Sequence, residues 1–278
     1  MRLFVTGATG FIGSHFLNHA LAEGHEIVAL CRALESRPRI ELAREPNWLT
    51  KSLSEVSGSD LRGCDCLVHL AATGISPRVA SRDELLKWNV MEPSRLLNKA
   101  AEANVKRWVV TGSFAEYGRA GEMYEFIPPD APLEPTFPYA ASKAAGSLMF
   151  REIATSEQAQ LSYMRLFSVF GPGQHEANLW PTLRRAARAG EDLPLTPGEQ
   201  VRDFISVEEV VKVILAAALD ESVTPRESRI RNVGTGHPQS VREFAEHWWQ
   251  KFEARGKLLF GALPYRADEV MRYVPLVA

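Results

Sequence analysis

The stretch Gly7-Ala8-Thr9-Gly10-Phe11-Ile12-Gly13 decides the fold, because it joins a short apolar run, Arg2–Thr6, to a segment of helical periodicity at 11–23. Glycines are needed there for a tight turn after a strand, for close approach of the backbone to a pyrophosphate and for packing of the helix on the strand. The start of the helix offers amide donors and a positive dipole end to phosphate groups. We therefore expect a dinucleotide to bind at Gly7, Gly10, Phe11, Ile12 and Gly13.

Signals for strands and helices alternate through the rest of the first half, which is typical of a parallel sheet covered by helices on both faces. The expected strands are 2–6, 26–31, 47–50, 66–72, 107–111, 161–167 and 230–233. The expected helices are 11–23, 83–103, 139–155, 179–189, 207–219 and 241–252. Clusters of proline and glycine predict loops at 171–173 and 193–198.

The composition excludes several classes of protein. The 278 residues are 45% hydrophobic and 24% charged, with a net charge of −2 and a pI near 6.4, so there is no basic footprint for nucleic acid or an anionic membrane. No apolar run is long enough to span a bilayer. The three cysteines, Cys31, Cys64 and Cys66, fit neither a zinc site nor a disulfide framework. We expect buried, reduced thiols, no metal and a cytoplasmic location.

The end of the second strand bears on the choice of cofactor. An acidic residue usually stands there and holds the adenosine ribose of NAD, but this chain has Cys31 followed by Arg32. A guanidinium can hold the 2′-phosphate of NADP in a bidentate way. A solvated loop arginine is the structural alternative, and Glu35 could still serve the ribose. The pattern favours NADP, with NAD as the alternative.

The pair Tyr139 and Lys143 is the candidate acid–base group, since residues at i and i+4 lie on one face of a helix. The pKa of tyrosine is ordinarily about 10. A neighbouring ammonium and a cationic nicotinamide would favour the phenolate and lower that pKa. Ser113, just past the strand at 107–111, would bond the substrate oxygen. Such a tyrosine–lysine spacing also occurs by chance on surface helices, so the pair needs its context.

That context is a series of motifs in a fixed order: TGATGFIG at 6–13, HLAA at 69–72, Asn89, TGSFAEYG at 111–118, PYAASK at 138–143 and VRDFISVEEV at 201–210. From Met1 to about Tyr273 the chain resembles the extended short-chain dehydrogenases/reductases that act on nucleotide sugars. The resemblance implies an α/β fold with a Rossmann-type, doubly wound parallel sheet in residues 1–167, rejoined by 201–235. A smaller substrate-binding domain would comprise 168–200 and 236–278.

The resemblance also implies roles for single residues. Ser113, Tyr139 and Lys143 match the family's catalytic positions. Cofactor contacts are implied for Leu70, Ala71, Ala72, Asn89, Tyr139 and Lys143, in addition to the glycine turn, Cys31 and Arg32. Substrate contacts are implied for Ser168, Trp180, Arg202, Arg266 and Glu269. Relatives commonly pair helices like 83–103 and 139–155 between two subunits, so a homodimer is expected.

The layout is similar to the branch of CDP-paratose and CDP-abequose synthases. This similarity, together with the lack of an acidic residue at the end of the second strand, predicts NADPH-dependent reduction of a nucleotide-linked 4-keto-6-deoxyhexose at C4. One alternative is a 4-epimerase that retains NAD, and another is a non-catalytic sensor of NADP. A sugar 4,6-dehydratase would need an acid and a base directly after Ser113. Phe114 and Ala115 stand there, and Glu116, one position farther, is expected to point elsewhere.

Overall fold

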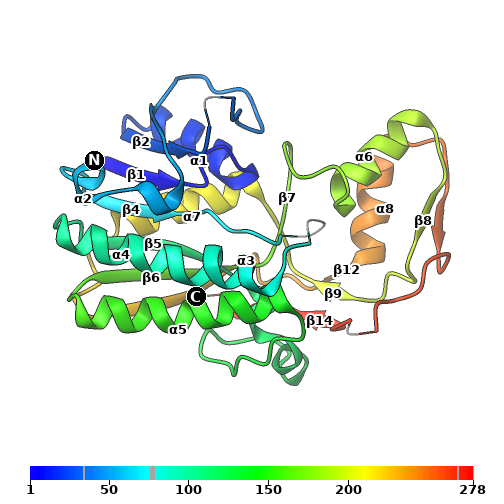
Figure 1. Ribbon diagram of the computed structural model, residues 1–278. Helices are drawn as coiled ribbons and strands as arrows, with labels where there is room; N and C mark the ends of the chain where they lie inside the picture. Colours follow the sequence, from blue (N-terminus) through cyan, green and yellow to red (C-terminus); the bar gives the residue numbers. More distant parts are fainter. Residues whose placement is uncertain (34, 76–78, 268, 278) are drawn as a thin grey trace.

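The computed structural model describes residues 1–33, 35–75, 79–267 and 269–277 (Figure 1). Its largest element is a parallel sheet of seven strands in the order β11-β6-β5-β4-β1-β2-β3. The strands are β1 (Arg2–Thr6), β2 (Glu26–Cys31), β3 (Asn47–Thr50), β4 (Cys66–His69), β5 (Arg107–Ser113), β6 (Gln160–Leu166) and β11 (Ser228–Val233). The parallel, Rossmann-like sheet that the sequence predicts is confirmed.

Helices cover both faces of the sheet, because successive side chains of a strand point to opposite sides. In β1, Leu3 and Val5 belong to the apolar cluster beneath α1 (Phe11–Ala22) and α7 (Val207–Leu219). Phe4 belongs to the cluster on the other face, beneath α4 (Glu92–Glu102) and α5 (Pro138–Ser156). The short α2 (Gly58–Leu61) packs against α4. No helix among the residues that the structure describes could cross a membrane.

The chain reverses direction at the centre of the sheet. From β1 it runs outward through β2 and β3, and then returns to β4 on the other side of β1 before continuing to β5 and β6. In open α/β sheets, ligands bind at such a switch point, beyond the carboxyl ends of the strands. Thr6, His69 and Ser113 end their strands at this edge, so the fold itself singles out the site.

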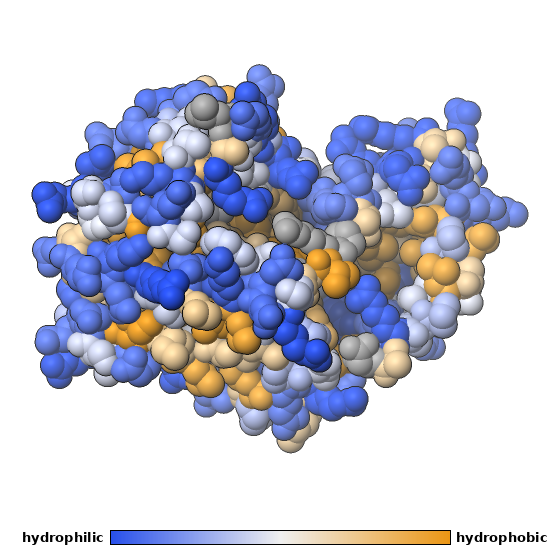
Figure 2. Space-filling model, viewed as in Figure 1, coloured by the Kyte–Doolittle hydropathy of each residue, from blue (hydrophilic) through white to orange (hydrophobic). Residues whose placement is uncertain are grey.

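The remaining elements form a second, smaller cluster, seen on the right of Figure 1. Helices α6 (Leu179–Ala189) and α8 (Val241–Lys251) pack on each other around aromatic side chains that include Trp180 and Phe244. Small sheets complete it: β8 (Leu193–Leu195) with β13 (Leu258–Phe260), β7 (Ser168–Phe170) with β10 (Phe204–Ser206), and β9 (Val201–Arg202) with β12 (Gln239–Ser240) and β14 (Arg272–Tyr273). Figure 2 shows the surface hollowed between this cluster and the large sheet.

The helix expected at 83–103 is interrupted. It consists of α3 (Arg82–Leu86), a π-helical turn at Lys87–Met91, and α4. Pro93 has no N–H to donate to the carbonyl of Asn89 four residues earlier. Helix α5 approaches that carbonyl closely, since a Cβ on Gly146 would lie 2.8 Å from it. The turn is therefore set by a proline on one helix and a glycine on its neighbour.

Two other expectations were wrong in detail. The strand expected at 66–72 ends at His69, and Leu70, Ala71 and Ala72 belong to the loop above the sheet. The loop expected at 193–198 contains β8, where Pro194 is exposed on a two-stranded sheet that has room for a residue without an N–H. The short strands β7, β9, β10, β12, β13 and β14 contain two or three residues each, too few for an alternating pattern to be recognised.

Candidate functional site

The glycine turn has the geometry that a phosphate-binding loop requires. Gly7 has a φ of +70°, and a Cβ there would lie 2.6 Å from the backbone nitrogen of Ala71. A Cβ on Gly13 would collide with the carbonyl oxygen of Gly7. A Cβ on Gly10, by contrast, would come within 4 Å of the Gly7 carbonyl alone, at 3.0 Å, so this part of the backbone is open to a ligand. Glycine is therefore needed at positions 7 and 13 to form the turn, and at position 10 to let a ligand approach the backbone.

The first turn of α1 suits an anion. Its N-cap, Gly10, offers no side chain to the amides that follow, and no acidic residue lies in the first turn. The N–H groups of the first turn, at Phe11, Ile12 and Gly13, have no partner within the helix. These N–H groups form the positive end of the helix dipole, where a pyrophosphate would be held. The residues present therefore fit the diphosphate of a dinucleotide.

At the end of β2, the two residues that bear on cofactor choice differ sharply in exposure. Cys31 is buried, and its Sγ lies 3.4 Å from Oγ1 of Thr50 on β3. Arg32 is exposed, and its guanidinium makes no hydrogen bond or ion pair within the described part of the chain. Glu35 is also exposed. An available cation thus stands one residue after the position at which many dinucleotide-binding proteins have an acid.

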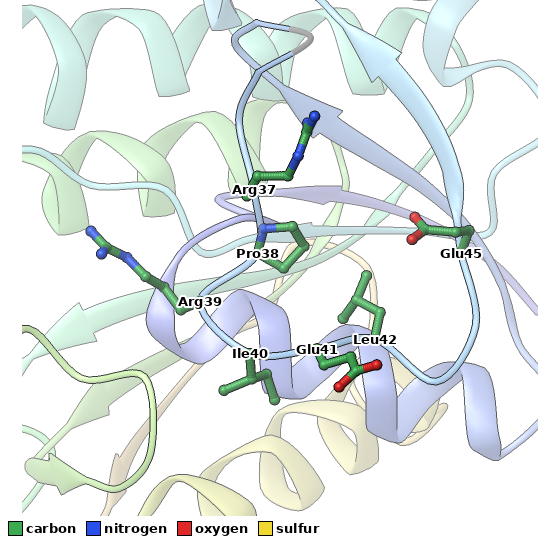
Figure 3. Close-up of a pocket in the computed structure, with 7 residues that line it drawn as sticks. All are labelled: Arg37, Pro38, Arg39, Ile40, Glu41, Leu42 and Glu45. Atoms are coloured by element: carbon green, nitrogen blue, oxygen red, sulfur yellow. The ribbon is translucent and has the colours of Figure 1, made fainter.

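The segment after β2 runs along α1 and is fastened to it. The N–H of Arg39 donates to Oγ of Ser14 (2.8 Å), and the Asn18 side chain donates to the carbonyl of Glu41 (2.8 Å). A hollow of about 460 Å³ opens beside this segment (Figure 3). Its lining residues are Arg37, Pro38, Arg39, Ile40, Glu41, Leu42 and Glu45. Arg37 and Arg39 point in different directions (Figure 3), and the hollow is separate from the candidate catalytic residues.

Asn89 is a brace between the loop above β4 and α5. Its Nδ2 donates to the carbonyl of Thr73 (3.0 Å) and to Oγ of Ser142 (2.9 Å). Its Oδ1 accepts from the N–H of Thr73 (2.8 Å). Both amide hydrogens are therefore used within the protein. The side chain is buried, and it fixes the position of the half-buried residues Leu70–Ala72, which the resemblance assigns to the cofactor.

The structure brings Ser113, Tyr139 and Lys143 together. Ser113 ends β5, and Tyr139 and Lys143 lie one turn apart on α5. Oγ of Ser113 accepts from the N–H of Ala115 (3.2 Å), and its side chain is hydrogen-bonded to that of Tyr139. Nζ of the buried Lys143 donates to the carbonyl of Thr111 (2.7 Å). A carbonyl or hydroxyl group above Ser113 would meet both hydroxyls.

The electrostatics of this group differ from the expectation. Burial, and then the charge of Glu116, raise the pKa of Tyr139 above its ordinary value, against a lowering by the hydrogen bond with Ser113. Burial lowers the pKa of Lys143, although Glu116 opposes this. The spacing of Tyr139 and Lys143 predicted a lowered pKa for the phenol. In the protein chain alone burial outweighs any such effect, and the phenol is held in its protonated form.

The residues expected to contact substrate are placed differently from one another. Nη2 of Arg202 donates to Oε1 of Glu269 (2.8 Å) and to the carbonyl of Val270 (2.7 Å), so these two expected residues do meet. Arg266 is exposed, and Asp268 beside it lies outside the described residues. Ser168 begins β7, and its N–H donates to the carbonyl of Asp203 (3.0 Å). Trp180 is 7% exposed and packs among aromatic rings in the core of the smaller cluster.

Sequence reasoning did not anticipate the roles of two buried carboxylates, although it expected Glu116 to point away from the substrate. Asp203, beside Arg202, accepts from the backbone N–H groups of Thr235 and His237 and so orders the loop after β11. Glu116 points into the core, where it accepts from the N–H of Ser113 (2.8 Å). The second could have been found, since serine followed three residues later by glutamate is the signature of a capping box. The first has no such local signal.

The structural roles expected of His69 and of the three cysteines are confirmed. His69 is a buried core residue, with Nδ1 lying 2.7 Å from Oγ1 of Thr6, and burial lowers its pKa to about 3. The three cysteines are buried and free. Within the described ranges, no group of three or more histidine, cysteine, aspartate or glutamate side chains could hold a metal ion.

Known proteins resemble this chain over most of its length. The model of the NAD dependent epimerase/dehydratase family matches residues 3–234. A dTDP-6-deoxy-L-talose 4-dehydrogenase (NAD(+)) from Aggregatibacter actinomycetemcomitans is 27% identical over 279 residues, with 98% of each chain covered. A UDP-glucose 4-epimerase from Mycolicibacterium smegmatis is 30% identical over 261 residues, covering 87% of this chain and 80% of the relative.

Among solved structures, MoeE5 in complex with UDP-glucuronic acid and NAD superposes with a TM-score of 0.84 at 28% identity, covering 100% of this chain and 90% of that chain. The match in sequence, the shared fold and the glycine turn agree. The chain therefore belongs to the NAD dependent epimerase/dehydratase family, and it is an enzyme of nucleotide-sugar metabolism.

Proposed function

We propose that the protein reduces a nucleotide-linked 4-keto-6-deoxyhexose at C4, with NADPH as the reductant. The observation that carries this proposal is the state of Tyr139, a half-buried phenol that is hydrogen-bonded to Ser113 and whose pKa is raised by burial and by the charge of Glu116, so that it is held protonated. A reductase needs a group that donates a proton to the carbonyl oxygen, whereas an enzyme that begins by oxidising a sugar hydroxyl needs the phenolate. The relative that is named a 4-dehydrogenase of a dTDP-6-deoxyhexose supports the same carbon and substrate class.

The residues divide the reaction between them. The reduced nicotinamide, when bound, supplies the hydride that C4 receives. Oγ of Ser113 orients the C4 carbonyl oxygen, and Tyr139 donates the proton that completes the alcohol, so one hydride and one proton convert the ketone. The ammonium of Lys143, which donates to the Thr111 carbonyl, would contact the cofactor ribose and stabilise the negative charge left on the phenolate of Tyr139. The cofactor would lie across Gly7–Gly13, Leu70–Ala72 and Asn89.

NADPH is the proposed reductant because of Arg32. Its guanidinium is exposed at the end of β2 and the described residues offer it no acidic partner, while the thiol of Cys31 faces Thr50. A 2′-phosphate would give Arg32 the bidentate partner that it lacks. NAD is the alternative, with Glu35 on the ribose, and it is the cofactor bound in the neighbouring structure.

A 4-epimerase is the second candidate, and the UDP-glucose 4-epimerase that is 30% identical to this chain favours it. An epimerase recovers its own hydride in each cycle and gains by never releasing the nicotinamide, whereas a reductase must exchange the cofactor. The purified protein should therefore be analysed for bound NAD⁺ and then supplied with NADPH and CDP-linked or dTDP-linked 4-keto-6-deoxyhexoses. We expect little bound NAD⁺ and consumption of NADPH in proportion to substrate. Retained NAD⁺, with two 4-epimers interconverting and no net use of cofactor, would show an epimerase.

The diphosphate of the substrate is assigned to Arg202 and Arg266, with Glu269 on the ribose. The guanidinium of Arg202 is largely shielded from water and lies over the ring of Tyr273. Burial lowers the pKa of Arg202, and the charge of Glu269 opposes this effect. Charge-assisted bonds are worth roughly 1.5–3 kcal/mol each. We predict that CDP or UDP inhibits competitively against the sugar substrate. Arg202→Ala should raise the inhibition constant about tenfold or more with little change in cofactor affinity. If nucleoside diphosphates do not compete, a ketone without a nucleotide becomes the better substrate class.

We also propose that residues 1–167 and 201–235 form the dinucleotide-binding domain and that residues 168–200 and 236–278 form the smaller, substrate-binding domain. We further propose that the protein is a homodimer. Support for the dimer comes from large apolar side chains that are exposed along α3, the π turn and α5, and Figure 2 shows apolar side chains gathered over this side. They are Leu86 (48%), Met91 (49%), Leu148 (59%) and Met149 (46%). Contiguous exposed apolar surface of this kind marks an interface.

A further inference from the structure

The side chain of Glu116 lies directly beneath the candidate catalytic group and is fully buried. Its Oε1 accepts from the N–H of Ser113 (2.8 Å) and from the hydroxyl of Tyr163 (2.8 Å). Its Oε2 accepts from Nε of Arg165 (2.7 Å), which completes a buried ion pair. Burying a charge is costly unless it is paired and hydrogen-bonded. Every oxygen of this carboxylate is satisfied, so the site is built for a charged glutamate.

The local sequence makes room for the carboxylate. A Cβ on Gly112 would lie 2.6 Å from Oε1 of Glu116 and 2.5 Å from the ring of Tyr163, so only glycine fits between Thr111 and Ser113. Glu116 itself is the third residue of a 3₁₀ turn, Phe114–Tyr117, in which it forms a capping box with Ser113. The turn therefore directs the glutamate inward and leaves the serine hydroxyl at the surface of the site.

The hydrogen bonds of Glu116 reach the elements that carry the candidate catalytic residues. Ser113 ends β5, while Tyr163 and Arg165 both lie on β6. The Tyr163 hydroxyl also lies 3.4 Å from the carbonyl oxygen of Lys143 on α5. Nη1 of Arg165 donates to the Tyr117 hydroxyl (3.0 Å) and to the carbonyl of Pro129 (2.7 Å). One carboxylate thus ties together the elements that hold Ser113, Tyr139 and Lys143.

The charge of Glu116 acts on both titratable groups of the site. It raises the pKa of Tyr139, after burial, and it opposes the fall in the pKa of Lys143 that burial causes. The other titratable groups packed around it are Tyr117 on its own turn and Tyr163 and Arg165 on β6. Among these, Glu116 is the charged group that favours the neutral phenol.

We propose that Glu116 is a positioning residue of this site: its carboxylate, hydrogen-bonded to the N–H of Ser113 and to Tyr163, sets the place of the serine hydroxyl and places a negative charge beneath the pair formed by Ser113 and Tyr139. The proposal rests on the proposed function, because it assigns a purpose to Tyr139 in a reduction. It is separate from the assignment of the sugar or of the cofactor.

The test compares two substitutions that divide shape from charge. Glu116→Gln keeps the length and one acceptor but removes the charge, and Glu116→Asp keeps the charge but withdraws it from Ser113. Glu102→Gln, at an exposed glutamate on α4, is the matched control. For each protein, kcat and KM are measured against pH with NADPH and a CDP-linked or dTDP-linked 4-keto-6-deoxyhexose.

For Glu116→Gln we expect the alkaline limb of the kcat profile to move to lower pH by about one unit or more, since one unit of pKa is a modest electrostatic change. The kcat should fall about tenfold or more, with KM for the sugar less affected. Glu116→Asp should lower kcat without moving the alkaline limb of the kcat profile. Glu102→Gln should have the same kcat, KM and pH profile as the unaltered protein. If the limb of Glu116→Gln does not move, the proposal is overturned.

A second measurement does not need turnover. Ultraviolet difference spectra follow the phenolate of Tyr139 in the NADP⁺ complex, taken as the unaltered protein minus Tyr139→Phe, and as Glu116→Gln minus the Glu116→Gln/Tyr139→Phe variant. We expect the second titration to lie at lower pH. If no nucleotide sugar is turned over but this shift is present, the proposed function fails and the role of Glu116 stands. If the reaction is confirmed and neither profile shifts, the role of Glu116 fails alone.

Glu116→Gln leaves Arg165 as an unpaired buried charge and can lose its fold for that reason. The variant Glu116→Gln/Arg165→Gln leaves no buried charge at this place. Since Glu116 rather than Arg165 raises the pKa of Tyr139, the double variant should show the same downward shift in both measurements. A folded double variant with an unshifted titration would contradict the proposal.

Discussion

At the scale of a single residue, we propose that Arg32 determines the choice of cofactor. Because its guanidinium is exposed and has no acidic partner in the described part of the chain, we expect NADPH to bind at least about tenfold more tightly than NADH, the equivalent of one charge-assisted hydrogen bond. Arg32→Glu should reverse this order, since a carboxylate repels the 2′-phosphate and accepts from the ribose. Fluorescence titration of both cofactors measures this, with Arg62→Glu, at an exposed arginine after α2, as the control. Equal affinities in the unaltered protein would refute the assignment.

His69 makes stability depend on pH. Burial lowers its pKa from 6.5 to about 3 in the folded protein. In this window the unfolded chain binds a proton that the folded chain does not, so the free energy of unfolding falls as the pH falls.

We predict that His69→Gln reduces the loss of stability between pH 7 and pH 5 by on the order of 1 kcal/mol, measured by urea denaturation at both pH values. Glutamine can still bond to Thr6. His247→Gln, at an exposed histidine on α8, should leave the loss unchanged. The same pH dependence in all three proteins would show that His69 is not the cause.

At the scale of an element, the start of α1 must lie close to the end of β1. A Cβ on Gly13 would collide with the Gly7 carbonyl oxygen, and backbone cannot move aside as a side chain can. We expect Gly13→Ala to lower the free energy of unfolding by about 1–3 kcal/mol and to weaken cofactor binding at least about tenfold. Gly58→Ala on α2, where a Cβ would meet no atom closer than 3.9 Å, is the control and should be near neutral. Unaltered NADPH affinity in Gly13→Ala would contradict this reading of the turn.

At the scale of the whole molecule, we propose that the exposed apolar side chains on α3, the π turn and α5 form the interface of a dimer. Leu148 is the most exposed of them, at 59%. Leu148→Asp should convert a dimer to a monomer in size-exclusion chromatography with light scattering, because a buried, unpaired charge is strongly unfavourable at an interface. Val213 is 37% exposed on α7, which covers the opposite face of the sheet, so Val213→Asp should remain dimeric. A monomeric unaltered protein would remove this interface.

The sequence by itself determined the features that depend on neighbours along the chain. The glycine turn follows from backbone geometry within seven residues, the alternation of strands and helices from hydrophobic periodicity, and the meeting of Tyr139 and Lys143 from the helical repeat. These local patterns, with the order of the motifs, were enough to predict the parallel sheet and the family. The resemblance assigned Arg202 and Glu269 to the substrate, but nothing in the sequence predicted that they pair with each other.

Tertiary structure decided what depends on distant residues. The ion pair of Glu116 joins positions 49 apart and that of Arg202 joins positions 67 apart, and neither separation leaves a pattern in the sequence. The same holds for the protonated state of Tyr139, because burial is a property of the folded chain. The helical spacing predicted that Lys143 would lower the pKa of Tyr139, but packing partly buries the phenol and places Glu116 beneath it, and both raise that pKa. The sequence placed these groups in one site, and packing determined their charge.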